Sequence, residues 1–183
     1  MNTSVISETS VISEKAIIGS NVTIGHFCVI EDDVVIGDNT TIEHYCLLKK
    51  GVVIGENNVV KSYVELREKT IIGNNCYIDS KVSSSGSCVV GNNVTLRYET
   101  ILARGVQVGD NSYLCPRVMT NNLNTGMDQV GGAKIGENCF IGTHSVLQYG
   151  IEIGDNVVVG SMAFVNKNVE ANQTVVGIPA KAR

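Results

Sequence analysis

The 183-residue chain has the length of one domain, and its formal net charge of −4 gives no reason to expect nucleic acid or an anionic membrane as a partner. Its 14 Lys and Arg residues are scattered rather than clustered. The sequence shows no basic and apolar leader, and no apolar run approaches the ~18 residues of a membrane-spanning helix. We therefore expect a cytoplasmic protein.

An apolar residue recurs at every sixth position from Ile6 to Leu114, and Ser84 is the polar exception. A helix of 3.6 residues per turn cannot keep a strict period of six on one face, and a simple strand would need apolar residues more often. The residue two places before each apolar position is small or slim, and the residue after it is often Gly followed by Asn, Asp or Glu. Because Gly and Asn tolerate the positive φ of a sharp corner, the pattern predicts a coil of short strands joined by tight corners.

Most of the cysteines stand in that slim position, where Cys acts as a small hydrophobic residue; these are Cys28, Cys46, Cys76, Cys88 and Cys139. Only Cys115 departs from it. The Cys and His residues do not have the spacing of a zinc site, so we expect no metal.

The segments IIGSNV, VVIGDNT, VVIGENN, TIIGNNC and IEIGDNV resemble the hexapeptide repeats of left-handed parallel β-helix acyltransferases. In that family, three hexapeptides form one triangular coil of about eighteen residues. The resemblance covers roughly the whole chain and implies an all-β, single-stranded left-handed parallel β-helix with one external loop. The left-handed coiling follows from the resemblance alone, because parallel crossovers are usually right-handed.

Taken in order, residues 1–119 are predicted to build six lower coils of a single domain that spans 1–183. Ser83 to Ser87 put polar residues where the interior should be apolar without changing the register, and we expect their hydroxyls to bond to the backbone. The rhythm breaks at TNNLNTGMDQVGGAK, so residues 120–134 are predicted to leave the helix as a loop. Residues 135–183 then form the upper coils and the tail. The step of fifteen residues from Thr120 to Ile135 is no multiple of six, which leaves open the face on which His144 lies.

Coils of about eighteen residues place Arg104 directly beneath Asn122, at the root of the loop, and we expect both to contact a substrate. The same spacing places Glu99 beneath Arg117, about one strand spacing of 4.8 Å away. Arg117 therefore has two possible roles, as a substrate-binding residue or as half of a surface ion pair that contributes little.

The ending VGIPAK resembles the terminus of coenzyme A-dependent hexapeptide acyltransferases, in which the last coils and the neighbouring subunit form a slot for pantetheine. The resemblance implies acetyl-CoA as the acyl donor and a homotrimer. It also implies cofactor-binding residues. The slot would be lined by Gly142, Gly160, Ser161 and Ala163. Lys167 and Lys181 would lie near the phosphates, and Pro179 would shape the exit of the slot. The alternative is that these glycines are only corner residues, because similar glycines occur in the lower coils.

The segment GVQVGDNSYLCPRVMTN resembles the corresponding part of nucleotide-linked amino-sugar N-acetyltransferases. It matches them at Gly105, Val106, Asp110, Pro116, Thr120 and Asn121. Cys115 stands where glycine is usual and Met119 where an aromatic residue is usual. The resemblance implies that Asn121 is catalytic and forms a hydrogen bond near the attacking amine or the thioester carbonyl.

The predicted function is acetyl-CoA-dependent N-acetylation of the amine of a nucleotide-linked amino sugar for surface glycan biosynthesis. A neutral amine is already a good nucleophile, so positioning and oxyanion stabilisation can supply much of the rate. His26 and His44 are expected at solvent-facing corners, whereas His144 has the alternatives of a general base and of a corner or trimer-contact residue. One alternative function is O-acetylation of a sugar or xenobiotic with His144 as base. The other is a non-catalytic β-helix scaffold.

Overall fold

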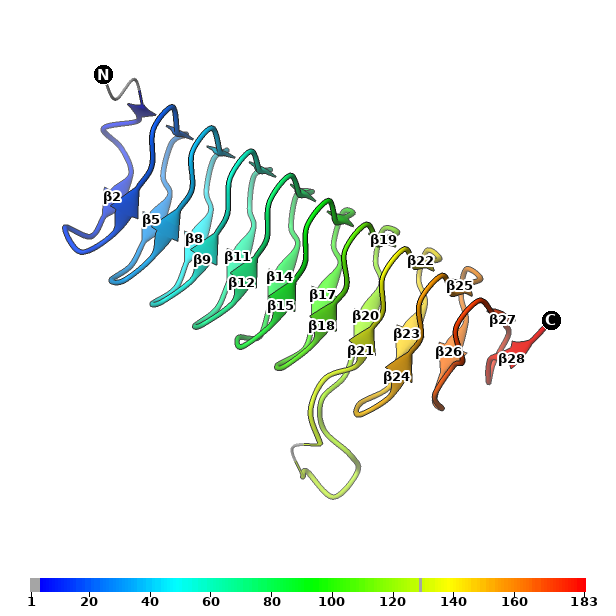
Figure 1. The fold of residues 1–183 in the computed structure, drawn as a ribbon. Helices are drawn as coiled ribbons and strands as arrows, with labels where there is room; N and C mark the ends of the chain where they lie inside the picture. The colour runs from blue at the N-terminus through cyan, green and yellow to red at the C-terminus, as the bar shows by residue number, and fades with distance from the viewer. Residues whose placement is uncertain (1–3, 129) are drawn as a thin grey trace.

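The computed structural model describes residues 4–128 and 130–183, which form a left-handed parallel β-helix. The coils lie one above another in a single row, with the N-terminus at one end and the C-terminus at the other, and one loop projects from the side (Figure 1). The all-β fold predicted from the six-residue rhythm is confirmed. Among the described residues, no helix is long and apolar enough to cross a membrane.

The strands are nearly all two residues long and stack in parallel register into three sheets, so each coil contributes one strand to each sheet. Sheet A consists of β1 (Val5–Ile6), β4 (Thr23–Ile24), β7 (Thr41–Ile42), β10 (Val59–Val60), β13 (Tyr77–Ile78), β16 (Thr95–Leu96), β19 (Tyr113–Leu114), β22 (Phe140–Ile141), β25 (Val158–Val159), β27 (Thr174–Val176) and β28 (Lys181–Ala182). Sheet B consists of β2 (Val11–Ile12), β5 (Val29–Ile30), β8 (Leu47–Leu48), β11 (Glu65–Leu66), β14 (Ser83–Ser84), β17 (Ile101–Leu102), β20 (Met119–Thr120), β23 (Val146–Leu147) and β26 (Phe164–Val165). Sheet C consists of β3 (Ile17–Ile18), β6 (Val35–Ile36), β9 (Val53–Ile54), β12 (Ile71–Ile72), β15 (Val89–Val90), β18 (Gln107–Val108), β21 (Lys134–Ile135) and β24 (Glu152–Ile153).

Each two-residue strand points its first side chain outward and its second into the core, which explains the period of six. In the second coil, Ile24, Ile30 and Ile36 are each 1% exposed, one from each sheet. Every such buried side chain contributes on the order of 1.5–3 kcal/mol. The slim residues two places earlier are buried as well, and they include the five cysteines of the slim position. The interior is therefore a continuous apolar column shared between neighbouring coils.

Polar residues in the core form hydrogen bonds. The buried Ser84 hydroxyl lies 2.8 Å from the Thr70 hydroxyl and accepts a 3.1 Å hydrogen bond from the backbone N–H of Arg67. The Thr120 hydroxyl donates to the Ile101 carbonyl (3.0 Å) and accepts from the N–H of Ala103 (2.7 Å). The expected bonding of serine to the backbone is thus observed at Ser84. The Thr120 hydroxyl also bonds to the backbone, at the point where the chain leaves the helix.

The corner between sheets C and A, the C–A corner, is built to one pattern along the helix. At this corner the residue with positive φ is always asparagine. These residues are Asn21, Asn39, Asn57, Asn75, Asn93, Asn111, Asn138, Asn156 and Asn172. Glycine precedes most of these corners because the backbones pack closely. A Cβ on Gly37, for example, would lie 2.6 Å from the backbone of Gly55.

The excursion lies between β20 and β21, and its length settles the register of the upper coils. Thr120 to Ile135 spans fifteen residues where a plain step between sheets takes six, so nine residues are inserted. Leu114 consequently pairs with Ile141, twenty-seven positions later instead of eighteen. The coils above the loop continue the same three sheets, and His144 falls in the column of Arg117.

The last strands, β27 and β28, pair antiparallel as a hairpin. The hairpin bonds to Phe164 of β26: the N–H of Phe164 donates to the Gly177 carbonyl (3.0 Å), and the N–H of Ala180 donates to the Phe164 carbonyl (2.8 Å). The VGIPAK ending is thereby fixed to the top coil.

Candidate functional site

A groove of about 460 Å³ lies along the outer face of sheet B in the coils below and above the loop. Its floor is formed by outward side chains of four successive sheet B strands, Ser83, Ile101, Met119 and Val146. One wall is the corner between sheets A and B, the A–B corner, which contributes Lys81, Glu99, Arg117 and His144. The groove thus has a floor of one serine and three apolar side chains beside a wall of mostly charged ones.

The charged wall is a ladder of side chains, in which each coil contributes one side chain. The Glu99 carboxylate accepts a 2.8 Å hydrogen bond from Arg117 Nε and lies 3.7 Å from Lys81 Nζ. The hydrogen bond from Arg117 holds the pKa of Glu99 below its usual value. Lys81 Nζ also lies 5.4 Å from the centre of the Tyr98 ring, and the contacts to Tyr98 and then to Glu99 raise the pKa of Lys81. The ion pair predicted between Glu99 and Arg117 is therefore present.

His144 extends this ladder by one coil. Arg117 Nη1 lies 3.5 Å from His144 Nε2. A guanidinium can only donate, so a hydrogen bond between these two groups requires Nε2 as its acceptor. The structure therefore brings Arg117 and His144 together, two residues whose relation was undetermined in the sequence.

Asn121, Asn122 and Arg104 lie elsewhere around the loop. Asn121 follows β20 at the far end of the sheet B strand from the A–B corner, and its N–H donates to the Leu147 carbonyl (3.1 Å) while its side chain is exposed. The Asn122 carbonyl accepts from the Val130 N–H (3.1 Å), which closes the neck of the loop. The guanidinium of Arg104 turns down the helix, where its Nη1 lies 3.2 Å from the position of a Cβ on Gly86. The Arg104 guanidinium is therefore directed to the coil below the loop.

The tip of the loop is closed by its own hydrogen bonds. Asn124 Nδ2 donates to Asp128 Oδ2 and the N–H of Asp128 donates to Asn124 Oδ1, both at 3.0 Å. The tip presents Met127, whose side chain is 75% exposed. The tip is therefore held by two hydrogen bonds and exposes one large apolar side chain.

Most of the predicted cofactor residues converge at the top of the A–B corner. Gly142 and Gly160 are stacked so closely that a Cβ on Gly142 would lie 2.5 Å from the Ser161 nitrogen. A Cβ on Gly160 would lie 2.7 Å from Val176 Cγ1, so the terminal hairpin adjoins this position. Pro179 and Lys181, which are both exposed, lie on that hairpin.

Two predicted cofactor residues differ from this group. Ala163 is 1% exposed and its side chain is part of the core, so only its backbone is available to a ligand. Lys167 follows Val165 on the opposite side of sheet B, at the corner that leads to sheet C.

His26 and His44 are exposed at the A–B corner of the lower coils, and their rings stack with centroids 5.3 Å apart. Within residues 4–128 and 130–183, no group of three or more His, Cys, Asp and Glu side chains is arranged to hold a metal ion.

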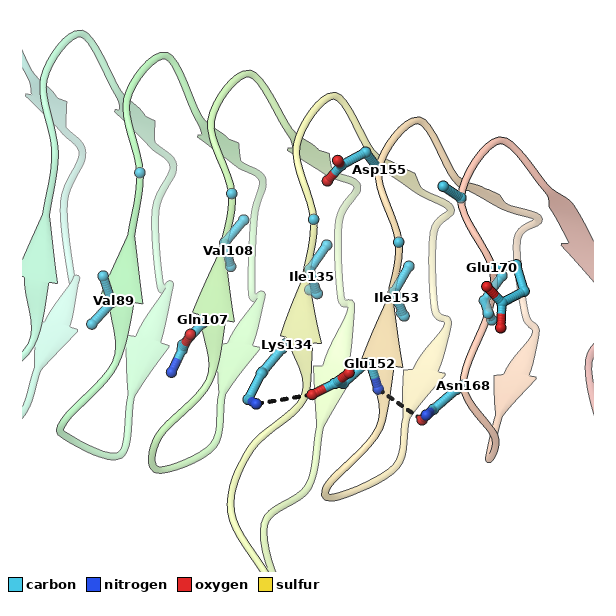
Figure 2. Close-up of a pocket in the computed structure, with 16 residues that line it drawn as sticks. Val89, Gln107, Val108, Lys134, Ile135, Glu152, Ile153, Asp155, Asn168 and Glu170 are labelled. Atoms are coloured by element: carbon cyan, nitrogen blue, oxygen red, sulfur yellow. Dashed lines mark hydrogen bonds and ion pairs between the residues drawn. The ribbon is translucent and has the colours of Figure 1, made fainter.

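A second groove, of about 610 Å³, follows the outer face of sheet C in the upper coils. There Lys134 donates to Glu152 at 2.9 Å, and the N–H of Glu152 donates to Asn168 Oδ1 at 3.0 Å (Figure 2). None of the residues predicted to be catalytic lines this groove. Its Lys134 and Glu152 are paired with each other, and Asp155 and Glu170 add two further carboxylates to its lining.

Comparison with known proteins supports the fold. The LpxA structure from Acinetobacter baumannii aligns over 98% of this chain and 73% of its own, with a TM-score of 0.74 and 22% identity. A UDP-N-acetylglucosamine acyltransferase from Francisella novicida aligns over 97% of this chain and 68% of its own, with a TM-score of 0.74 and 20% identity. A maltose O-acetyltransferase from Clostridium difficile aligns over 61% of this chain and 65% of its own, with a TM-score of 0.50 and 27% identity. No curated protein matches the sequence.

Two family models match the sequence. The model described as bacterial transferase hexapeptide (six repeats) matches residues 132–167, and the one described as GMPPB C-terminal domain matches residues 12–116, more than half of the chain. The chain is therefore a hexapeptide-repeat protein, the class to which its structural neighbours belong. Within that class it belongs to the family of the GMPPB C-terminal domain.

Proposed function

We propose that this protein is a cytoplasmic, homotrimeric acyltransferase that moves an acetyl group from acetyl-CoA to the amine of a nucleotide-linked amino sugar for surface glycan biosynthesis. The sheet B groove would hold the acceptor, with Asn121, Asn122, Arg104 and Arg117 around it. The upper A–B corner would hold the donor.

The observation that carries this proposal is the convergence of two segments at one end of the helix. The VGIPAK hairpin is bonded to Phe164, directly above the stacked Gly142 and Gly160, and these glycines stand in the corner that continues to His144. Side-chain-free backbone allows close approach of a ligand such as a pantetheine arm. A donor lying along these glycines would present its thioester to the groove.

The contact between Arg117 and His144 favours an amine acceptor over a hydroxyl acceptor. His144 Nε2 lies 3.5 Å from Arg117 Nη1, so this ring nitrogen already contacts a group that can only donate a hydrogen bond. A hydroxyl needs a base, whereas a neutral amine attacks a thioester without one, and a hydrogen bond from Asn121 can position it.

The first test is binding and turnover by the purified protein. We expect acetyl-CoA to raise the melting temperature, because a ligand that binds only the folded state stabilises it. We also expect release of free coenzyme A with at least one UDP- or dTDP-linked amino sugar. A protein with neither response, across a panel of such sugars, is a non-catalytic scaffold and refutes the proposal.

Replacement of His144 distinguishes amine from hydroxyl transfer. For the proposed amine transfer, His144→Ala should lower kcat by less than about tenfold, because positioning remains and no base is lost. A loss of several hundredfold, about the range of general-base catalysis, would instead identify an O-acetyltransferase. His26→Ala, a corner histidine in the lower coils, is the matched control.

A further inference from the structure

The charged wall of the sheet B groove contains two cations that converge on one carboxylate. Arg117 Nε donates to Glu99 Oε2 at 2.8 Å, and Lys81 Nζ lies 3.7 Å from Glu99 Oε1. Lys81 comes from the coil below Glu99 and Arg117 from the coil above it. Three charged side chains from three successive coils therefore meet at one point of the wall.

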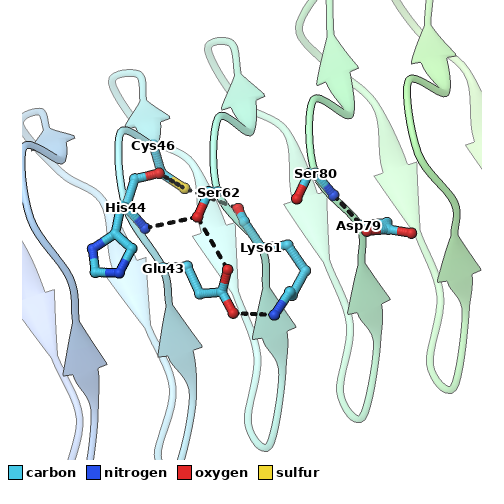
Figure 3. Close-up of polar contacts among 7 residues, drawn as sticks. All are labelled: Glu43, His44, Cys46, Lys61, Ser62, Asp79 and Ser80. Atoms are coloured by element: carbon cyan, nitrogen blue, oxygen red, sulfur yellow. Dashed lines mark hydrogen bonds and ion pairs between the residues drawn. The ribbon is translucent and has the colours of Figure 1, made fainter.

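The two ion pairs lower on the A–B corner each join one carboxylate to one cation. Glu43 is paired with Lys61 and also accepts a 3.0 Å hydrogen bond from Ser62 Oγ (Figure 3). Asp79 is paired with Arg97 at 3.0 Å. Among the ion pairs of the described residues, those in the groove are the only ones in which two cations share a carboxylate. This part of the corner therefore carries an excess of positive charge.

The groove on sheet C has the opposite balance of charge. Its lining includes Lys134 and three carboxylates, those of Glu152, Asp155 and Glu170. The chain as a whole has a formal net charge of −4. An anionic ligand is therefore favoured by the wall of the sheet B groove and disfavoured by the sheet C groove.

A stronger anion can replace the Glu99 carboxylate between the two cations. The side chains of Lys81 and Arg117 are each 52% exposed, and that of Glu99 is 34% exposed. Exposed ion pairs of this kind contribute little, because water screens both charges. A diphosphate carries more negative charge than a carboxylate and has more oxygen atoms, and arginine binds phosphate oxygens through parallel hydrogen bonds. The exchange of Glu99 for a diphosphate thus strengthens both cation contacts.

We propose that Lys81 and Arg117 bind the diphosphate of the nucleotide-linked acceptor and that Glu99 competes with it for these two cations; this inference rests on the proposed function and locates the diphosphate within the acceptor groove. Ile101 and Met119 on the floor beside the cations give the nucleoside an apolar surface to pack against. A free sugar has no group that displaces Glu99. The groove therefore distinguishes nucleotide-linked sugars from free ones.

Coenzyme A also contains a diphosphate, so the experiment has to separate the acceptor from the donor. Isothermal titration calorimetry measures the dissociation constants of UDP and dTDP, of uridine, which has no phosphate, and of coenzyme A. The proteins are the wild type and the single variants Glu99→Gln, Lys81→Gln, Arg117→Gln and Glu65→Gln. Glu65→Gln is the matched control, because Glu65 points outward from the same sheet, lies outside the groove and is paired with Arg67 alone.

We expect Glu99→Gln to lower the dissociation constant for UDP or dTDP by about fivefold, because the competing carboxylate is gone. Lys81→Gln and Arg117→Gln should each raise it by about tenfold or more, because a charge-assisted hydrogen bond to the diphosphate is lost. Glu65→Gln removes the same charge at a distance and should stay within about twofold of the wild type, because solvent and salt screen it. Glu99→Gln should not change the dissociation constants for uridine and coenzyme A.

Unchanged or weaker binding of UDP and dTDP by Glu99→Gln would overturn the proposal, since a purely structural ion pair predicts that result. Absence of binding by the wild type, an equal gain in Glu65→Gln, or a gain for uridine or coenzyme A in Glu99→Gln would overturn it as well. Circular dichroism confirms that each variant is folded.

The titrations involve no acetyl transfer, so this proposal and the proposed function can fail independently. Nucleotide binding with the expected variant effects but without turnover of acetyl-CoA refutes the proposed function alone. Turnover by a protein whose affinity for nucleotides does not respond to Glu99→Gln refutes the diphosphate site alone.

Discussion

At the scale of single residues, hydrogen-bonding capacity decides which polar side chains can replace an apolar one in the core. Ser84 and Thr120 both stand at positions of the apolar rhythm, and both reach backbone N–H groups of the adjoining coil. An aliphatic residue of the same size would leave such an N–H without its partner. Buried hydroxyls in this helix are therefore structural.

Replacing Ser84 by Ala should lower the free energy of unfolding by about 1–3 kcal/mol, because the Thr70 hydroxyl and the Arg67 N–H both lose their partner. Chemical denaturation measures the change. Ser85→Ala is the matched control, since the Ser85 hydroxyl forms no hydrogen bond within the part of the chain that the structure describes. Equal midpoints for the two variants would contradict the structural role of Ser84.

The hydrogen bond between Arg117 and Glu99 makes the stability of the protein depend on pH. Its hydrogen bond lowers the pKa of Glu99 in the folded state, so Glu99 contributes stability above the usual carboxyl pKa and loses it as pH falls through the folded value. Arg117→Gln should therefore show a smaller fall in melting temperature between about pH 7 and about pH 4 than the wild type. Glu99→Gln should reduce the fall by a similar amount, and the double variant should add nothing further. An undiminished fall in Arg117→Gln would argue against this coupling.

At the scale of elements, the sequence predicts the repeating strands better than it predicts the loop that interrupts them. The six-residue rhythm determines strand positions because each inward side chain must be apolar, and the left-handed coiling came from family resemblance. The register above the loop could not be predicted, because an excursion of fifteen residues is compatible with more than one number of replaced hexapeptides. The contact between Arg117 and His144 depends on that register. The downward turn of Arg104 was equally inaccessible, because it depends on a side-chain rotamer.

Removing the nine inserted residues, 123–131, tests the loop as an element. Five residues then separate Thr120 from Ile135, as in every plain step between sheets, and Ala133 keeps its buried slim position. We expect a folded protein with a melting temperature close to that of the wild type. If the protein has the proposed function, acetyl transfer should fall by about a hundredfold or more, because the acceptor loses its positioning. Unchanged activity would show that the loop takes no part in the reaction.

At the scale of the whole molecule, each coil is stabilised by the two coils that it touches, so stability should vary along the axis. The first coil has one neighbour among the described residues, and its inward Ile6 is 42% exposed. In the middle, Ile54, Val60 and Leu66 are fully buried.

Hydrogen exchange should follow this gradient. Amides of β10, β11 and β12 should exchange at least about tenfold more slowly than those of β1, β2 and β3, because terminal coils open at lower cost. Mass spectrometry of peptic peptides measures both regions in one experiment. Uniform protection along the axis would mean that the helix opens only as a single unit.

The nine-residue insertion has a consequence for how this scaffold can diversify. The loop begins and ends on adjoining strands, closes its tip with Asn124 and Asp128, and leaves the sheets above it in phase. Its length and composition can thus change during evolution, or in a selection library, without disturbing the stacking of the glycines that adjoin the terminal hairpin. The preference for an acceptor would then evolve independently of the recognition of the donor. A panel of grafted loops could change the acceptor preference while donor recognition stays constant.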